Sequence, residues 1–186
     1  MKRLIIFVFM LVTAQLFAQI NPAYISPVKV GNMNMQTGKV FYQNTFGNGA
    51  NLARLAEKFK TKEQVYSVFN INSVTQNEIK GTITNFQLNI DEFGVKRKKL
   101  DGFLVRPLNA TFNIELTGGK NQVTVRNIWF SNLPGEKSNG NKNLESLVSS
   151  KNGTIFLNDK KNLRSITVID KNLDDLFNLA TAGTGF

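Results

Sequence analysis

The sequence predicts an α+β domain with a curved antiparallel sheet of five strands and helices packed on one face, in the order β-α-β-β-β-β-α. Three observations predict this fold class. Two long runs of alternating apolar and polar residues meet at a Gly-Gly pair between residues 104 and 130. Apolar residues recur with a helical period over 52–59 and again over 163–180. The alternation also changes parity inside two strands, as it does at β-bulges.

The hairpin at 104–130 is the element on which the rest of the predicted sheet is built. Its two runs are joined at Thr117-Gly118-Gly119-Lys120, and glycine accepts the positive φ of a tight turn. The first run has one apolar and one polar side. The apolar residues are Leu108, Ala110, Phe112, Ile114 and Leu116, and the polar ones are Asn109, Thr111, Asn113 and Glu115. Alternation of this kind is typical of a strand with one buried face.

Three further strands are predicted before this hairpin, over 39–46, 65–74 and 78–91, and the fifth strand covers 122–130. In the third strand, the apolar parity changes near Thr84-Asn85. In the fifth, it changes between Val125 and Ile128. Because a one-residue change of parity is what a bulge produces, and bulges bend strands, the sheet is expected to be curved.

Two helices are predicted. In the first, Leu52, Leu55, Ala56 and Phe59 form an apolar stripe, which Asn48 or Asn51 can cap. The second covers 163–180, although its β-branched run 166–169 and the cations near its start also allow a strand over 163–169 and a shorter helix from Lys171. The period holds over five turns and favours the long helix. Between the fifth strand and this helix, the sequence predicts a loop over 131–142 and an extended piece over 154–157, and 144–148 can hold a short helix.

The sequence predicts a signal peptide (1–18), an extended leader (19–37), a single domain (38–182) and a tail (183–186). Lys2 and Arg3 precede the apolar run Leu4–Val12, and Ala18 provides a small residue for cleavage. This run is shorter than the roughly 20 residues that span a bilayer, so no integral membrane protein is expected after cleavage. The leader's apolar residues can also add an edge strand. The predicted location is periplasmic or secreted, without a lipoprotein cysteine.

Composition excludes several kinds of site. The chain has no cysteine and no histidine, which removes histidine-based triads, catalytic cysteines and His/Cys zinc sites. No cofactor is predicted. Without Lys2 and Arg3, 21 basic residues face 13 acidic ones, a net charge of +8. Such a surface favours anionic polymers or lipid head groups.

Four short segments resemble the uncharacterised exported bacterial domain that is described as having a TATA-binding-protein-like (TBP-like) fold. They are Gly38-Lys39-Val40, the segment 78–82 (EIKGT), the segment 128–133 (IWFSNL), and Ile169-Asp170-Lys171 followed by Leu176-Phe177. The resemblance covers roughly Gly38 to Ala180. It implies a curved antiparallel sheet with helices on one face. It implies no known activity and no catalytic residues.

Two groups of residues are candidate contact sites. The basic run Lys96-Arg97-Lys98-Lys99 is a possible contact for an anionic partner, or a solvated connection between strands. The polar side of the sheet is the second candidate, because amide-rich surfaces suit sugars or extended peptides. Its residues are Asn109, Thr111, Asn113, Glu115, Thr124 and Arg126. The alternative is the ordinary wet side of a half-buried sheet.

These features favour an exported, non-catalytic binding or structural module of the cell envelope, with an envelope protein or an anionic envelope polymer as its partner. No aromatic residues interleave the basic run, which argues against nucleic acid. One alternative is a carboxylate-dependent hydrolase using Asp91-Glu92, Asp101 or Asp174-Asp175. Another is a carrier of an apolar small ligand between sheet and helix, although 15 phenylalanines favour a filled interior.

Overall fold

The structure is a computed structural model that describes residues 25–26, 28–46, 51–61, 67–94, 96–133, 140–150 and 153–181. The predicted signal peptide (1–18), the start of the leader (19–24) and the tail (183–186) lie outside the described residues. Within the described part of the chain, no helix has both the length and the apolar character needed to cross a bilayer.

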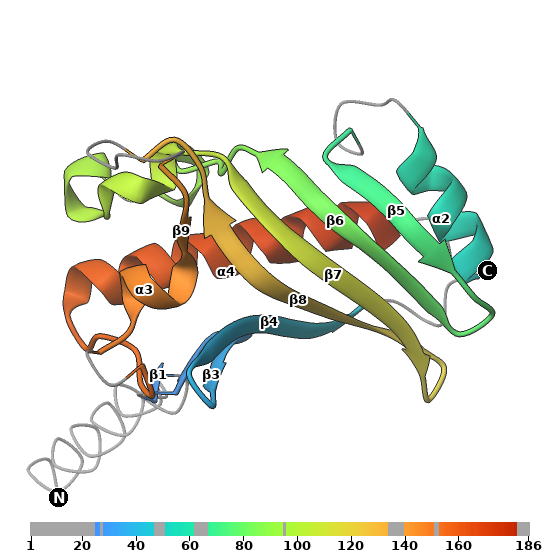
Figure 1. Ribbon diagram of the computed structural model, residues 1–186, viewed down its shortest axis with the longest axis horizontal. Coiled ribbons are helices and arrows are strands. Elements are labelled where there is room, and N and C mark those ends of the chain that lie inside the picture. The colour runs from blue at the N-terminus through green and yellow to red at the C-terminus, as the bar shows by residue number, and fades with distance from the viewer. Residues whose placement is uncertain are drawn as a thin grey trace, which may run out of the picture.

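Among the described residues, the sheet is antiparallel and has nine strands in the order β1-β2-β3-β4-β8-β7-β6-β5, with β9 paired to β8 (Figure 1). The predicted sheet of five strands is therefore right in class and wrong in size. The additional strands are β1 (Ile25–Ser26), β2 (Lys29–Val30), β3 (Met33–Gln36) and β9 (Lys142–Asn143).

The five predicted strands are all present. They are β4 (Lys39–Phe46), β5 (Phe69–Val74), β6 (Glu78–Phe86), β7 (Leu108–Thr117) and β8 (Lys120–Phe130). The third strand ends at Phe86 instead of continuing to Asp91. Three short 3-10 helices then follow, namely η2 (Asp91–Phe93), η3 (Arg97–Lys99) and η4 (Gly102–Val105). Leu88, Ile90, Phe103 and Leu104 are buried, so this connection packs on the domain.

Strands β1 to β3 fall in the predicted leader, whose apolar residues were open to an edge-strand interpretation. They form a meander that continues directly into β4, with Met33 opposite Tyr42 and Met35 opposite Val40. Met33 and Met35 alternate with Asn34 and are buried, so the period of two is the local cause of the strand. The sheet therefore extends well beyond the predicted first strand.

Both long predicted helices are confirmed, and so is the short one. They are α2 (Leu52–Lys60), α3 (Leu144–Val148) and α4 (Lys160–Thr181). Asn51 caps α2 by accepting hydrogen bonds from the N–H groups of Ala53 and Arg54. Without the 3-10 helices, the element order of the described residues is β-β-β-β-α-β-β-β-β-β-α-α, which differs from the predicted one by the four added strands and by α3.

The alternative of a strand over 163–169 is wrong, because Asp159 offsets the cations that argued against a helix start. Its Oδ1 accepts the N–H groups of Lys161 and Asn162 at 3.0 and 2.9 Å, which places a carboxylate at the N-terminus of α4. The ammonium group of Lys161 is also 3.3 Å from Oδ1 of Asp101.

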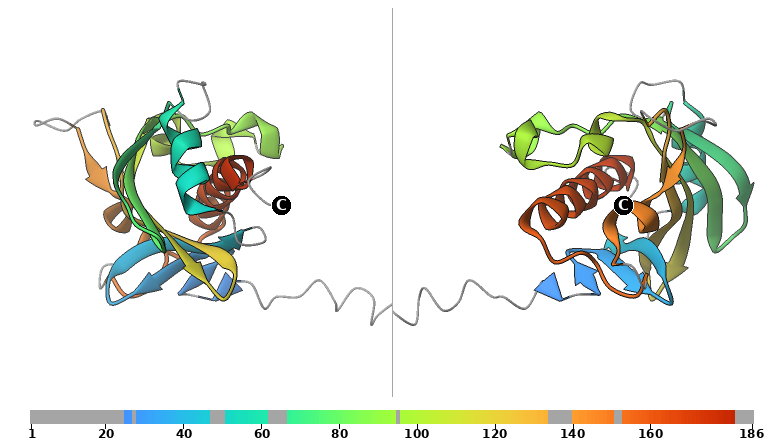
Figure 2. Two further views of the ribbon diagram at one scale, coloured as in Figure 1. Left: turned by 90° about the vertical axis from the view of Figure 1, so that its right-hand side faces the viewer. Right: turned by 60° about the vertical axis from the view of Figure 1, so that its left-hand side comes forward.

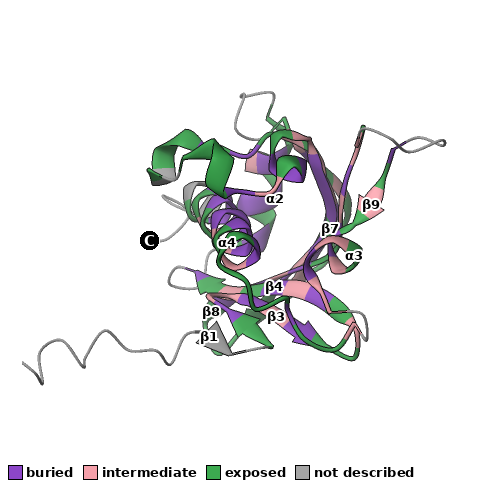
Figure 3. Cartoon of the chain, turned by 90° about the vertical axis from the view of Figure 1, so that its left-hand side faces the viewer, coloured by how far each residue is buried: buried purple, intermediate pink, exposed green. Residues whose placement is uncertain are grey.

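The sheet curves around α4, and α2 lies on the same concave side (Figures 1 and 2). Side chains facing α4 are buried, whereas much of the opposite side of the sheet is exposed or half-buried (Figure 3). The Phe177 ring on α4 lies within 6.4 Å, centroid to centroid, of the rings of Tyr42, Phe46, Phe69 and Phe112. Helices therefore cover one face, as predicted.

Both predicted bulges are present. The β6–β7 register shifts between Ile83 and Phe86, where Asn85 has φ of 56°. The β7–β8 register shifts opposite Asn109–Thr111, where Asn127 has φ of 50°. Asparagine tolerates this left-handed conformation better than most residues do. Each bulge returns the apolar side chains to the concave side while the strand bends.

Candidate functional site

The outer face of the sheet, defined as the side of β4, β6, β7 and β8 turned away from α4, brings most of the predicted polar contacts together. The register places Asn113 between Lys80 and Thr124, and Thr124 is also opposite Gln43. The next row contains Thr82, Thr111 and Arg126. Glu115 is exposed at the end of the face, opposite Glu78.

Asn109, in contrast, is buried and takes part in the fold. Its Oδ1 accepts the N–H of Asn85 at 3.0 Å, and its Nδ2 donates to the carbonyl of Pro107 at 3.4 Å. Asn85 lies in the bulge of β6 and has no paired residue in β7, so its N–H group takes the side chain of Asn109 as acceptor. The side chain of Asn109 therefore stabilises the bend of the sheet and is not placed to touch a partner.

A first hollow of about 260 Å³ lies on the outer face where β6, β7 and β8 run side by side. Its polar lining comes from neighbouring strands and includes Asn72, Lys80, Thr111, Asn113, Thr124 and Arg126. Lys80 is 2.7 Å from Glu78, and this hydrogen bond lowers the pKa of the Glu78 carboxyl group. The Oδ1 atom of Asn113 is buried and has no hydrogen-bond partner within the described structure.

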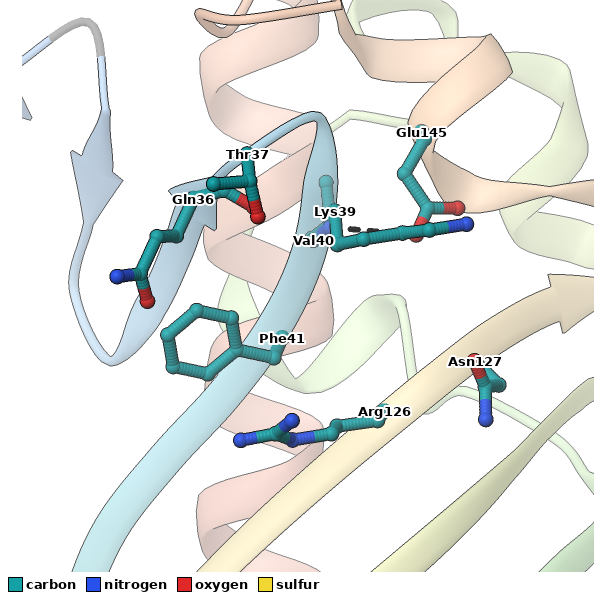
Figure 4. A pocket seen from close by; sticks show the side chains of 8 residues that line it. All are labelled: Gln36, Thr37, Lys39, Val40, Phe41, Arg126, Asn127 and Glu145. Atoms are coloured by element: carbon teal, nitrogen blue, oxygen red, sulfur yellow. Dashed lines mark hydrogen bonds between the residues drawn. The ribbon is translucent and has the colours of Figure 1, made fainter.

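A second hollow of about 190 Å³ lies where β4 and β8 separate (Figure 4). The two strands pair only from Tyr42–Val125 to Phe46–Asn121, so Lys39, Val40 and Phe41 have no partner strand on that side. Glu145 of α3 fills part of the gap and accepts the N–H of Val40 at 3.2 Å. The lining residues are Gln36, Thr37, Lys39, Val40, Phe41, Arg126, Asn127 and Glu145.

Arg126 is shared by the two hollows. Its guanidinium carbon lies 5.6 Å from the centroid of the Phe41 ring, a cation–π distance. Figure 4 shows the side chain reaching from β8 toward that ring. No carboxylate of the described residues lies within ion-pair distance of Arg126, so its charge is available at the surface. Arg126 is therefore the centre of the outer face.

The predicted basic run lies elsewhere. Residues 96–99 surround η3, in the connection between β6 and β7, and not on the outer face. Arg97 donates from Nε and Nη2 to the two carboxylate oxygens of Asp91 at 3.2 and 2.7 Å. This pair lowers the pKa of the Asp91 carboxyl group and raises that of the guanidinium. Lys96, Lys98 and Lys99 are exposed.

Three of the carboxylates considered for hydrolysis are engaged in other contacts. Asp91 pairs with Arg97, and Asp101 pairs with Lys161. Asp174 accepts hydrogen bonds from the Tyr42 hydroxyl at 2.5 Å and from the amide groups of Asn32 and Asn44. Among the residues that the structure describes, no three acidic side chains meet as metal ligands.

Sequence reasoning missed Lys39, Phe41 and Glu145. Phe41 alternates with the buried residues Val40 and Tyr42, so its outward direction was readable from the sequence. The separation of β4 from β8 and the position of α3 in that gap were not readable. They depend on which strands pair across 80 residues of chain, and local patterns carry no such information.

No family model matches the chain, and no curated protein matches it. Two solved structures are similar to it. One is a DUF4468 family protein from Bacteroides ovatus ATCC 8483, with 13% identity over 83% of this chain and 92% of that chain and a TM-score of 0.49. The other is a TBP-like protein from Parabacteroides distasonis ATCC 8503, with 15% identity over 80% and 96% and a TM-score of 0.48. The second of these is described as TBP-like, which is the fold named in the resemblance stated from the sequence.

Proposed function

We propose that the chain is an exported, non-catalytic binding module of the bacterial cell envelope that recognises an anionic polysaccharide through its outer face. The observation that carries this proposal is the position of Arg126. It lines both hollows, lies over an aromatic ring and has no carboxylate partner among the described residues.

Charge at the two hollows favours an anionic ligand. Lys39, Lys80 and Arg126 line them, although Lys80 pairs with Glu78, and Glu145 is the single carboxylate among the described lining residues. The Glu145 carboxylate already accepts the N–H of Val40. An arginine that is not already bound to a carboxylate is well suited to a uronic acid or similar group, because its planar fork binds carboxylates in a bidentate manner.

The size and lining of the hollows favour a polymer over a compact ligand. At about 260 and 190 Å³, both are smaller than the 300–1,000 Å³ that is common for drug-sized ligands. Each therefore suits one sugar unit, and a chain of sugars can occupy both across Arg126. The threonine and asparagine side chains between them supply hydroxyl and amide groups for sugar hydroxyls.

A non-catalytic role accords with the chemistry of the lining. Glycoside hydrolysis uses two carboxyl groups on opposite sides of the scissile bond, and these hollows contribute Glu145 alone from the described residues. The aromatic packing around Phe177 supports a filled interior, which is the reason we favour surface binding over an apolar carrier.

The test compares binding of polygalacturonate, a polyuronic acid, with binding of uncharged dextran by isothermal titration calorimetry. We expect binding of polygalacturonate only, and a loss of about tenfold or more in Arg126→Gln, because a charge-assisted hydrogen bond is removed. Lys60→Gln on α2 removes one positive charge away from the outer face and should leave the affinity within about twofold. Equal binding by Arg126→Gln and the unmodified chain, or equal binding of dextran, would overturn the proposal.

A further inference from the structure

The connection between β6 and β7 folds back onto the first turns of α4. The N–H of Asp101 donates to Oγ of Ser165 at 2.9 Å, and the Asp101 carboxylate lies 3.3 Å from the ammonium group of Lys161. Figure 2 shows this connection (yellow-green) beside α4 (red) in the right-hand view, as Figure 1 does from another side. Two segments some 60 residues apart in the sequence therefore share one surface.

This contact gathers cations from both segments into one patch, which we call the basic end. All of its side chains are exposed, and they are Lys96, Arg97, Lys98 and Lys99 around η3 with Lys160, Lys161 and Arg164 of α4. Within the described residues, Arg97 and Lys161 make ion pairs, with Asp91 and Asp101. The other five side chains form no ion pair there, so their charge faces the solvent.

Exposed apolar side chains adjoin the basic end. Leu157 and Ile155, just before α4, are 38% and 40% exposed. The side chain of Asn162 donates to the carbonyl of Leu157 at 2.8 Å, which fixes this segment against the first turn of α4. Single exposed apolar residues are common on protein surfaces, but two of them beside a cationic patch form the combination that suits a bilayer interface.

We propose that the basic end docks on the surface of a bilayer that contains anionic phospholipids. Lipid phosphates attract the cations, and each Lys or Arg near such a surface strengthens binding by about fivefold. Leu157 and Ile155 can enter the boundary between head groups and acyl chains, which a soluble anionic polymer does not offer. The basic end is separate from the outer face, so this docking leaves Arg126 open and does not depend on the proposed polysaccharide site.

The test is cosedimentation of the chain with vesicles of phosphatidylcholine, either pure or with about one third phosphatidylglycerol. We expect binding to the anionic vesicles only, and a marked loss as salt rises from about 0.1 M to about 0.5 M. The triple variant Lys98→Glu, Lys99→Glu, Arg164→Glu should bind the anionic vesicles about tenfold or more weakly. The matched control Lys58→Glu, Lys60→Glu, Lys120→Glu has the same net charge, and its affinity for these vesicles should fall by less than about threefold. The N-terminal segment is unchanged in every variant, and circular dichroism checks that each one is folded.

A further variant separates a bilayer from a soluble anion. Leu157→Ser should weaken vesicle binding by about threefold or more, while any binding to polyphosphate in solution stays the same. The proposal is overturned if the control variant loses as much as the basic-end variant, if pure phosphatidylcholine binds equally well, or if Leu157→Ser leaves vesicle binding unchanged.

Discussion

The backbone N–H of Asn32 donates to Oδ1 of Asp170 at 2.9 Å, across 138 residues of chain. The side chain of Asn32 also donates to both carboxylate oxygens of Asp174, each at 3.1 Å. One residue in the turn between β2 and β3 therefore binds two successive turns of α4. These bonds make the N-terminal strands part of the domain's tertiary structure and explain why the sheet reaches around the helix.

Gly31, next to Asn32, is the position where an added side chain should disturb this contact most. A Cβ atom there would lie 2.0 Å from Oδ2 of Asp170, and the residue has φ of +58°. We expect Gly31→Ala to lower the free energy of unfolding by about 3 kcal/mol, measured by urea denaturation. Gly118→Ala is the matched control, since Gly118 has φ of +57° and open space around its Cα, and it should cost only about 1 kcal/mol.

A double-mutant cycle identifies the cause. In an Asp170→Ala background the clash is gone, so Gly31→Ala should there cost about as much as Gly118→Ala does. An equal cost of Gly31→Ala in both backgrounds would show that the carboxylate does not crowd this turn.

The Asp170 carboxyl group should make stability depend on pH. Burial raises its pKa to about 6, and the nearby Asp174 adds to this, against the hydrogen bond from Asn32. The folded chain thus binds the proton more tightly than the unfolded chain, whose pKa is near 3.8. Asp170 therefore stabilises the folded chain fully below about pH 4. As pH rises toward 6 this contribution is lost, which lowers the free energy of unfolding by about 2 kcal/mol.

Asp170→Asn should remove this dependence, because its amide oxygen can still accept the N–H of Asn32. Urea denaturation between about pH 4 and 7 measures the difference between variant and unmodified chain. As pH rises across this range, we expect the free energy of unfolding of the variant to increase by about 2 kcal/mol relative to that of the unmodified chain. A difference that does not change with pH would contradict the proposed burial of the charge.

The hydroxyl of Tyr42 donates the shortest of the hydrogen bonds to Asp174, at 2.5 Å. Burial and the neighbouring carboxylate raise the pKa of this phenol, so it remains a donor throughout the neutral range. Tyr42→Phe keeps the ring, which stacks on Phe177 with centroids 6.4 Å apart, and removes only the donor. We expect a loss of about 1–3 kcal/mol in urea denaturation. A change below about 0.5 kcal/mol would mean that the bond adds nothing to stability.

Asn109 and Thr124 separate folding from binding on the same pair of strands. Asn109→Ala should cost about 1–2 kcal/mol of stability, because the N–H of Asn85 loses its acceptor, and should leave polygalacturonate affinity unchanged. Thr124→Val should weaken polygalacturonate binding and leave stability unchanged. Thr124 lines the first hollow, and valine has nearly the same shape as threonine but lacks the hydroxyl group. Calorimetric titration and thermal unfolding of both variants check this. Weaker polygalacturonate binding by Asn109→Ala with unchanged stability would contradict its structural role.

Local patterns predicted the curved part of the sheet well. The parity changes at Thr84-Asn85 and between Val125 and Ile128 are where the register shifts, because a bulge leaves a one-residue trace in the sequence. The apolar side of 108–114 is buried as predicted, whereas Leu116 near the turn is 37% exposed. Helix periods likewise predicted α2 and α4, since burial of one stripe is a local property.

The rest depended on long-range contacts. The meander β1–β3 contains strands of two to four residues, too short for a clear pattern in the sequence, and contacts with β4 and α4 hold them in the sheet. The position of Phe41 beside Arg126 likewise follows from the pairing of β4 with β8, and that of Glu145 from the packing of α3 between them. The sequence does not show which other cations lie near the basic run 96–99. The contacts of Asp101 with Ser165 and Lys161 bring the first turns of α4 beside it.

The most direct test of the central claim is amide chemical-shift mapping of the folded chain during titration with an oligogalacturonate. We expect the largest shifts on the outer face, at Arg126, Phe41, Thr124 and their strand neighbours, and we expect Arg126→Gln to abolish them. Shifts confined to the concave side around α4, to the basic end, or spread evenly over the surface would contradict recognition through the outer face.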